Sequence, residues 1–199
     1  PYLHQAQAIG YAAVEKKNLV IMTGTGSGKT ESFLMPVLAS LAEEAQDQPA
    51  QFAQPAVRTM VLYPMNALVN DQLSRLRAMF GDPRIVELFK SWAGRPPRFA
   101  RYTSRTPYAG IRTTEGDKRS LKAFGDFYVK FAEEAALGDA EAAALVQELR
   151  SRGKWPAKPD IGAWYGKPST RWQDTAGNFK RAITQPDDAE QVTRHEVQV

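Results

Sequence analysis

Hydrophobic positions in the first 83 residues alternate between short continuous runs and stripes at helical spacing. The runs 19–22 and 57–63 are apolar and bounded by Gly or Pro, which is typical of fully buried strands in a parallel sheet. The tripeptide Gly81-Asp82-Pro83 marks the end of the last stripe. The stripes predict three helices, which we expect over residues 4–14, from 28 to about 44, and over 67–80. Helices that alternate with strands favour a doubly wound α/β domain.

The remaining segments predict loops and a helical hairpin. Residues 46–56 are polar and contain proline, and residues 92–116 are rich in Arg, Pro, Gly and Tyr, so we expect both to be loops. Two further helices are predicted over 118–137 and 140–150. Asp139 stands directly before the second of these, where a carboxylate can cap the free N–H groups of the first turn.

These elements suggest how the chain is organised. We expect residues 1–106 to be the N-terminal part of an α/β core, residues 107–190 to be an insertion that carries the hairpin, and residues 191–199 to return toward the core. The first residue is Pro1 and not Met, which indicates an internal segment of a longer protein.

Composition excludes several classes of protein. Of the 199 residues, 43% are hydrophobic and 24% are charged, which is the range of globular proteins. No run approaches 18 apolar residues, so the sequence predicts no membrane span. The chain has no cysteine, which excludes a disulfide framework, a thiolate metal site and a catalytic cysteine, and which fits a cytoplasmic protein.

Charge is distributed unevenly along the chain. Residues 84–130 carry 11 basic and 4 acidic side chains, and residues 151–181 carry 7 and 2. Residues 131–150, which are rich in alanine, carry 1 basic and 5 acidic side chains. Basic stretches with interleaved aromatic residues favour binding to a phosphate backbone, and the alternative is the solvated surface of a large protein.

Residues 23–30 form the main candidate functional motif. They read Thr-Gly-Thr-Gly-Ser-Gly-Lys-Thr and lie between a predicted strand and a predicted helix. This context is typical of a P-loop, whose glycines let backbone N–H groups surround phosphate oxygens at a helix N-terminus. Lys29 would supply a cation for the phosphates, and the Thr30 hydroxyl would coordinate Mg²⁺. The strict motif has Gly where Thr23 stands, and a glycine-rich turn is the alternative.

The surrounding residues resemble the superfamily 2 helicases. Residues 23–31 resemble motif I of that family, and Gln5 matches the glutamine of its Q motif. Residues 63–72, Tyr-Pro-Met-Asn-Ala-Leu-Val-Asn-Asp-Gln, resemble motif Ia, and residues 101–107 resemble motif Ib with Ser104 in place of Gly. The sequence of residues 1–107 is most similar to the branch that contains the mitomycin-repair helicases and the helicase of DISARM phage-defence systems.

This resemblance implies a partial RecA-like P-loop NTPase domain, a parallel sheet flanked by helices, with an inserted helical and loop-rich basic element. It implies ATP and Mg²⁺ as cofactors, DNA that is single-stranded or has a single-strand end as substrate, and a possible defence-system partner protein. Carried over to this chain, the ATP-binding residues are Gln5 at the adenine and Thr23, Gly24, Thr25, Gly26, Ser27, Gly28, Lys29, Thr30 and Glu31. The residues expected at the nucleic-acid backbone are Pro64, Met65, Asn66, Gln72, Thr103, Arg105 and Thr106, with Arg101 near them.

The sequence contains no recognisable motif II, the apolar strand ending in Asp-Glu that completes the ATP site. We therefore expect motif II and a second RecA-like domain to lie beyond this segment, and the segment alone to be inactive. Two alternatives stay open: a P-loop kinase for a small molecule, and a non-hydrolysing binding module with a vestigial P-loop.

Tryptophans in the second half of the chain allow two interpretations. They could stack on unpaired bases beside neighbouring Arg and Lys, or they could pin loops to a core, which is the commoner role of an aromatic side chain in a loop. The residues concerned are Trp92, Trp155, Trp164 and Trp172.

Overall fold

The computed structural model describes residues 2–54, 56–106, 119–121, 123, 125–157 and 190–191. The chain divides into two compact units. The first contains Pro1–Val61 with Ser91–Gly94, and the second contains Leu62–Lys90 with Arg95–Val199. Among the described residues, no helix is long and apolar enough to cross a membrane.

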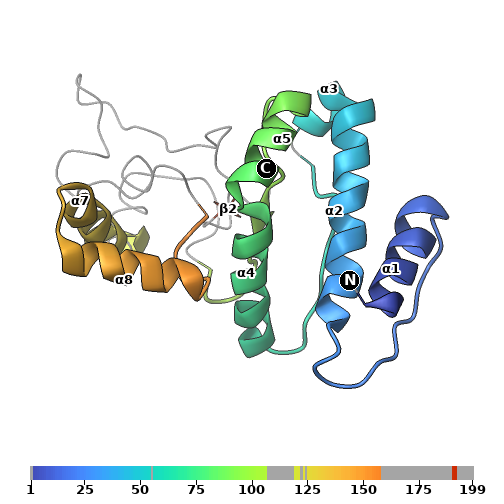
Figure 1. The fold of residues 1–199 in the computed structure, drawn as a ribbon, viewed down its shortest axis with the longest axis horizontal. Helices are drawn as coiled ribbons and strands as arrows, with labels where there is room; N and C mark the ends of the chain where they lie inside the picture. The colour runs from blue at the N-terminus through green and yellow to red at the C-terminus, as the bar shows by residue number, and fades with distance from the viewer. Residues whose placement is uncertain are drawn as a thin grey trace. The chain divides into compact units, whose positions relative to one another are not determined.

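The first unit is built from helices. Helix α1 (Leu3–Ile9) continues into a π-helical turn, η1 (Gly10–Val14), and packs alongside α2 (Lys29–Asp47) (Figure 1). Both helices confirm the sequence prediction. The 46–56 segment was expected to be a loop, but it contains a short helix, α3 (Pro49–Ala53). Pro49 stands at the first helical position, where its fixed φ and missing N–H favour a helix start, so that expectation was wrong.

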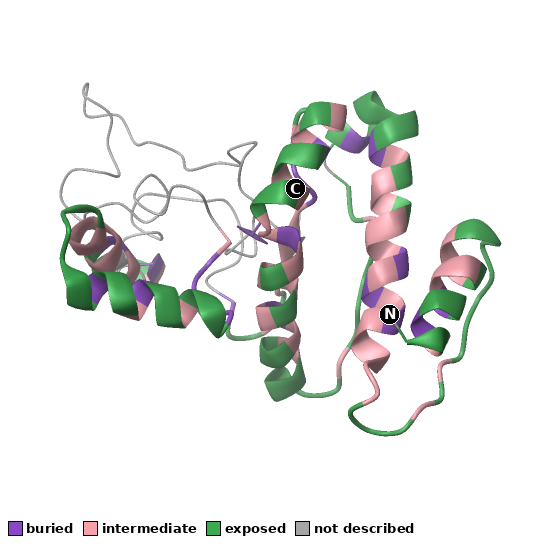
Figure 2. Cartoon of the chain, viewed as in Figure 1, coloured by how far each residue is buried: buried purple, intermediate pink, exposed green. Residues whose placement is uncertain are grey.

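The two predicted strands are not formed, which corrects the sequence prediction. Residues 19–22 and 57–63 have no regular secondary structure. Their apolar side chains are open to solvent, with Val20 89% and Leu62 82% exposed, and Figure 2 shows the connection from η1 to α2 as mostly exposed. A strand of a parallel sheet is stabilised only by hydrogen bonds to neighbouring strands, and the described residues pair neither run with another segment.

The second unit begins with two helices in succession. Helix α4 (Asn66–Phe80) confirms the prediction, and α5 (Pro83–Ala93), whose last three residues belong to the first unit, was not predicted. Asp82 caps α5, because its carboxylate accepts a hydrogen bond of 2.8 Å from the Arg84 backbone N–H. Gly81-Asp82-Pro83 therefore ends one helix and starts the next.

The sheet of the described residues consists of two short parallel strands in this second unit. Strand β1 (Phe99–Ala100) pairs with β2 (Glu190–Gln191), with Phe99 opposite Glu190 and Ala100 opposite Gln191. Residues 107–118, 158–189 and 192–199 lie outside the described residues, so the predicted insertion and the predicted return of 191–199 toward the core stay predictions.

The predicted hairpin is present and has its own core. It consists of helical residues at 119–121 and 123, a π-helical turn η2 (Gly125–Val129), α7 (Lys130–Ala136) and α8 (Ala140–Ser151). Asp139 caps α8 by accepting a 2.8 Å hydrogen bond from the Ala142 N–H, as predicted. The buried side chains that pack together are Leu121, Val129, Val146 and Trp155.

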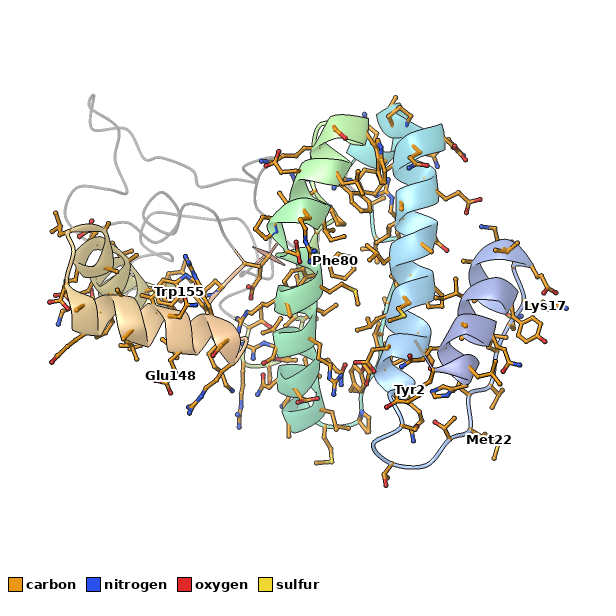
Figure 3. All side chains as sticks on the ribbon, viewed as in Figure 1. Tyr2, Lys17, Met22, Phe80, Glu148 and Trp155 are labelled. Carbon is orange, nitrogen blue, oxygen red and sulfur yellow. The ribbon has the colours of Figure 1, made fainter. Side chains whose placement is uncertain are left out.

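Trp155 anchors the turn that follows α8. It is 5% exposed, and its ring meets Tyr128 edge-on at 5.1 Å. Figure 3 labels Trp155 next to α8. This confirms the anchoring interpretation for Trp155. Trp164 and Trp172 lie outside the described residues.

Arg77 joins α4 to strand β2 through a buried ion pair and to the end of the hairpin through a hydrogen bond. Arg77 of α4 contacts the carboxylate of Glu190 at 2.8 to 3.1 Å and donates to the Gly153 carbonyl at 2.9 Å. The Ala157 N–H donates to the same carboxylate at 2.8 Å. Gly153 has φ +62°, and a Cβ there would lie 2.7 Å from the Cβ of Ser74 on α4, so only glycine permits this approach.

Candidate nucleotide and nucleic-acid sites

The P-loop of residues 23–28 precedes α2 in the first unit, as the sequence predicts, although no strand precedes it. The Lys29 ammonium donates to the carbonyls of Thr23 and Gly24, at 2.6 Å in both cases. The cation is therefore directed into the loop and held by two neutral acceptors. Because phosphate oxygens are charged, they are stronger partners for an ammonium group than these carbonyls are.

Thr23 braces the loop. The Ser27 hydroxyl lies 2.7 Å from the Thr23 hydroxyl and 2.8 Å from the Gly24 carbonyl. Glycine at position 23, as in the strict motif, would have no hydroxyl and would remove this link across the loop. The departure from the strict motif thus has a local structural role.

Two glycines give the loop its curvature. Gly26 and Gly28 have φ +77° and +79°, the left-handed region in which a side chain is strained. Gly28 also precedes α2 directly, so its carbonyl belongs to the first turn and the helix N–H groups open into the loop. A Cβ at Gly28 would lie 2.4 Å from Nε2 of Gln5. The conformation requires glycine there, and a Cβ would displace the Gln5 amide.

Gln5 meets the loop from α1. Its side chain is 4% exposed, and its Nε2 donates to the Gly28 carbonyl at 3.0 Å. Its Oε1 accepts a 2.8 Å hydrogen bond from the Tyr2 backbone N–H at the start of α1. Figure 3 shows Tyr2 beside the N-terminal end of α2. The sequence marks Gln5 as a site residue, but no local signal indicates this contact with a glycine 23 residues away.

The loop fits a nucleotide triphosphate with Mg²⁺. The fit rests on the left-handed glycines, the N-terminus of α2 and the ammonium of Lys29. Thr30 and Glu31 lie in the first turn of α2 and are half-buried. In a P-loop, the hydroxyl at the position of Thr30 is a metal ligand. Within the described residues, no three His, Cys, Asp or Glu side chains cluster as a metal site.

Motif Ia residues lie at the N-terminus of α4 in the second unit. Met65 is the N-cap residue, and Asn66 begins the helix. Pro64, Met65 and Asn66 are exposed, so the free N–H groups of the first turn are accessible. Gln72 lies about two turns further along, and its Nε2 donates to Asp71 at 3.2 Å.

Motif Ib residues form a tight turn after β1. The Thr106 N–H donates to the Thr103 carbonyl at 3.1 Å. The Thr106 hydroxyl donates to the Arg101 carbonyl at 2.8 Å and accepts from the Thr103 N–H at 2.9 Å. Thr106 is 5% exposed, so it builds the turn from inside, whereas Arg105 is exposed at its tip.

Arg101 joins the two motifs of the second unit. Its guanidinium donates to the Asn70 side-chain carbonyl on α4. Burial, together with the charge of Arg77, lowers the pKa of the Arg101 guanidinium. The structure thus brings motif Ib onto the helix that motif Ia begins, and brings Gln5 onto the P-loop in the first unit. Trp92, which lies on α5, is half-buried.

The glycine loop at the start of α2, the start of α4 and the turn after β1 follow one another along the chain in the order that the sequence predicts for motifs I, Ia and Ib. Residues 2–109 match the family of DEAD/DEAH box helicases. The chain belongs to the DEAD/DEAH box helicase family. Membership implies a RecA-like α/β fold, although the described residues show only the two-stranded sheet of β1 and β2. DEAD/DEAH box helicases use ATP, generally with Mg²⁺, in agreement with the fit of the P-loop.

Curated relatives are similar to the chain over different lengths. Druantia protein DruE of Escherichia coli (strain UMEA 4076-1) is 42% identical over 212 residues, which cover all of this chain and 11% of that protein. The uncharacterized ATP-dependent helicase MJ1574 of Methanocaldococcus jannaschii is 32% identical over 74 residues, or 37% of this chain and 9% of that protein. ATP-dependent RNA helicase DBP9 of Scheffersomyces stipitis is 32% identical over 73 residues, which cover 37% of this chain and 12% of that protein. The chain thus spans about a tenth of each relative, and no solved structure matches it.

Proposed function

We propose that this chain is the ATP-binding N-terminal segment of an ATP-dependent DNA helicase or translocase of the DEAD/DEAH box family. The observation that carries the proposal is the Lys29 ammonium, which points onto the carbonyls of a glycine loop with left-handed Gly26 and Gly28 at the start of α2. Residues 23–29 bind the ATP phosphates, and the Thr30 hydroxyl coordinates Mg²⁺. The bound Mg²⁺–ATP supplies the phosphoanhydride bond whose hydrolysis drives the motor.

The second unit supplies the nucleic-acid contacts. Pro64, Met65 and Asn66 present the N-terminus of α4, which favours an anionic phosphate. Gln72 and Thr103 lie on the same helix and on the adjoining turn, and Arg105 adds an exposed cation. The buried Thr106 shapes the turn and does not itself contact the strand.

Completion of the ATP site requires further parts of the protein. We propose that motif II and a second RecA-like domain are supplied by the rest of the polypeptide, and that ATP binding brings the two domains together. The cellular process proposed is phage defence or DNA repair, with a possible defence-system partner protein. The support for this process is the resemblance of residues 1–107 to the branch that contains the mitomycin-repair and DISARM helicases.

One alternative is weakened and one is retained. Membership of a helicase family argues against a kinase for a small molecule. A binding module with a vestigial P-loop would also contain the second-unit features, so it is distinguished by turnover alone. The test is ATP hydrolysis by the full-length protein without nucleic acid, with single-stranded DNA and with single-stranded RNA. We expect stimulation by DNA; equal rates in all three conditions would contradict a DNA motor, and stimulation by RNA alone would reassign the substrate.

A further inference from the structure

Three cations stand together where α8 ends. Residues 150–154 read Arg-Ser-Arg-Gly-Lys, and we call this segment the basic turn. Arg150, Arg152 and Lys154 are all exposed. Arg152 pairs with Glu148 at 3.0 Å through side chains that are 67% and 51% exposed, so this pair is open to water and weak. In the described part of the chain, neither Arg150 nor Lys154 forms an ion pair, so the turn presents positive charge to the solvent.

The backbone carbonyls of this turn are used within the protein. The Leu149 carbonyl accepts from the Lys154 N–H at 2.7 Å, and the Lys154 carbonyl accepts from the Tyr128 hydroxyl at 3.1 Å. The Gly153 carbonyl accepts from Arg77 at 2.9 Å. Free carbonyls at the end of a helix carry partial negative charge and disfavour an anion. Because these three are engaged, the cations dominate the surface of the turn.

The basic turn is held directly against α4. Gly153 has φ +62°, and a Cβ there would lie 2.7 Å from the Cβ of Ser74. Arg77, three residues after Ser74, donates to the carbonyl of the same glycine. One close backbone approach and one hydrogen bond therefore fix the turn on a single face of α4.

Motif Ib lies on the same face of α4. The Arg101 guanidinium donates to Asn70, which precedes Ser74 by four residues. Positions 70, 74 and 77 follow one another at helical spacing, so they share one face of the helix. Burial lowers the pKa of Arg101, and the charges of Arg77 and Glu190 also act on it, in agreement with this placement. The turn of residues 103–106 and the basic turn are thus attached to one face of the same helix.

We propose that the basic turn is a further contact for the phosphodiester backbone of single-stranded DNA, continuous with the contact at motif Ib. This rests on the proposed function, because the strand must already lie at the start of α4 and at Arg105. Contacts to phosphates do not depend on the base sequence, so the basic turn lengthens the binding surface and does not select a sequence. Cations at a helix end can also serve only the helix dipole, and that role predicts no effect on DNA binding.

The first experiment removes the charges from the full-length protein. Affinity for a fluorescent single-stranded oligothymidylate is measured by anisotropy over a range of salt concentrations, without nucleotide. We expect the combined variant Arg150→Gln, Arg152→Gln and Lys154→Gln to bind more weakly and to reduce the slope of log K against log salt by about 2, or about 0.7 for each phosphate contact. Lys130→Gln is the control, because Lys130 is an exposed lysine on α7 of the same hairpin. We expect it to leave the slope unchanged.

The second experiment keeps every charge and moves the turn. Gly153→Ala places a Cβ against Ser74 and so displaces the basic turn from α4. Gly138→Ala is the matched control, because Gly138 also has a left-handed φ, +94°, but no atom lies within 4 Å of its Cβ position. We expect Gly153→Ala to lower the salt slope and Gly138→Ala to keep it. Denaturant unfolding shows which variants are folded, and the charge variant decides if Gly153→Ala is not.

Every other result counts against the inference. A folded charge variant with the wild-type affinity and salt slope would show that the basic turn does not contact DNA. Equal slopes for Gly153→Ala and Gly138→Ala would show that its placement on α4 has no role. The proposed function stands in both cases if Arg105→Ala still weakens DNA binding. Wild-type protein that does not bind single-stranded DNA would instead overturn the proposed function itself.

Discussion

The guanidinium of Arg77 donates to both carboxylate oxygens of Glu190, which lies 113 residues further along the chain. The two side chains are 16% and 4% exposed, so the pair is largely removed from water. The pair links helix α4 to strand β2, and Arg77 also donates to the Gly153 carbonyl in the turn after α8. Strand β2 and the end of the helical hairpin are therefore attached to the helix proposed to contact nucleic acid.

Removal of Arg77 is expected to destabilise the second unit strongly. Arg77→Ala leaves the Glu190 carboxylate buried without its cation, which costs about 3 kcal/mol of the free energy of unfolding. Arg75→Ala on the same helix is the control, because its pair with Asp71 is exposed and contributes less than about 0.5 kcal/mol. Denaturant unfolding measures the free energy of unfolding of both variants. Equal losses would show that the buried ion pair stabilises the protein no more than the exposed one.

Arg58 is expected to hold the end of α2 to α3 in the first unit. Its Nε contacts both Glu44 oxygens at 2.7 and 2.8 Å, and it donates to the Gln51 carbonyl at 2.8 Å. Arg58→Ala should lower the free energy of unfolding by about 2 kcal/mol, because Glu44 then loses its charged partner in a half-buried site. Denaturant unfolding measures this loss. Lys16→Ala, which removes an exposed ion pair with Glu43, is the control and should lower the free energy of unfolding much less.

Asp82 is expected to make stability depend on pH at the acid end. Hydrogen bonds from the Arg84 side chain and backbone hold the pKa of the Asp82 carboxyl at about 2, below its usual 3.8. Because the folded-state pKa is lowered, this contribution is complete above about pH 4 and is lost as the pH falls toward 2.

Asp82→Asn tests this directly, since Asn still caps α5 but does not titrate. We expect its unfolding midpoint to change less between pH 4 and pH 2 than that of wild type. Glu87→Gln, an acid-to-amide change on the same helix, is the control. If the unfolding midpoints of wild type and of Asp82→Asn change equally between pH 4 and pH 2, the assignment to Asp82 is wrong.

Arg105 is expected to contribute one phosphate contact. It is exposed at the tip of the Thr103–Thr106 turn and lies on the unit that contains motif Ia. In the full-length protein, Arg105→Ala should weaken single-stranded DNA binding and reduce the slope of log K against log salt by about 0.7. Lys130→Ala, which removes an exposed cation on the hairpin, is the variant whose DNA binding and salt slope are measured beside it. An unchanged slope for Arg105→Ala would remove it from the interface.

Features that depend on neighbouring residues were predictable from the sequence. Helices α2 and α4 and the Asp139 cap follow from apolar spacing and from a carboxylate before a helix, both of which act over a few residues. The missed helices α3 and α5 share one error. Pro49 and Pro83 were taken to end or exclude a helix, although proline at the first helical position favours a start.

Features that depend on distant residues were not predictable. The runs 19–22 and 57–63 have the composition of buried strands, but a strand forms only when partners supply its hydrogen bonds, and composition does not contain that information. In the site, the glycine loop and Lys29 were predictable as a local motif. The Gln5–Gly28 contact and the burial of Thr106 result from packing, so the sequence indicated the residues but not these contacts.

The central claim is that Lys29 in this loop supports ATP hydrolysis by the full-length protein. The most direct measurement is the steady-state rate of ATP hydrolysis by Lys29→Ala with saturating single-stranded DNA, beside Lys17→Ala as the matched control on an exposed lysine. We predict that Lys29→Ala lowers the rate of ATP hydrolysis at least about 100-fold, because the Lys29 ammonium no longer stabilises the negative charge of the phosphates. We predict that Lys17→Ala hydrolyses ATP at the wild-type rate. A folded Lys29→Ala protein with the wild-type rate would show that the P-loop is vestigial and would contradict the proposal.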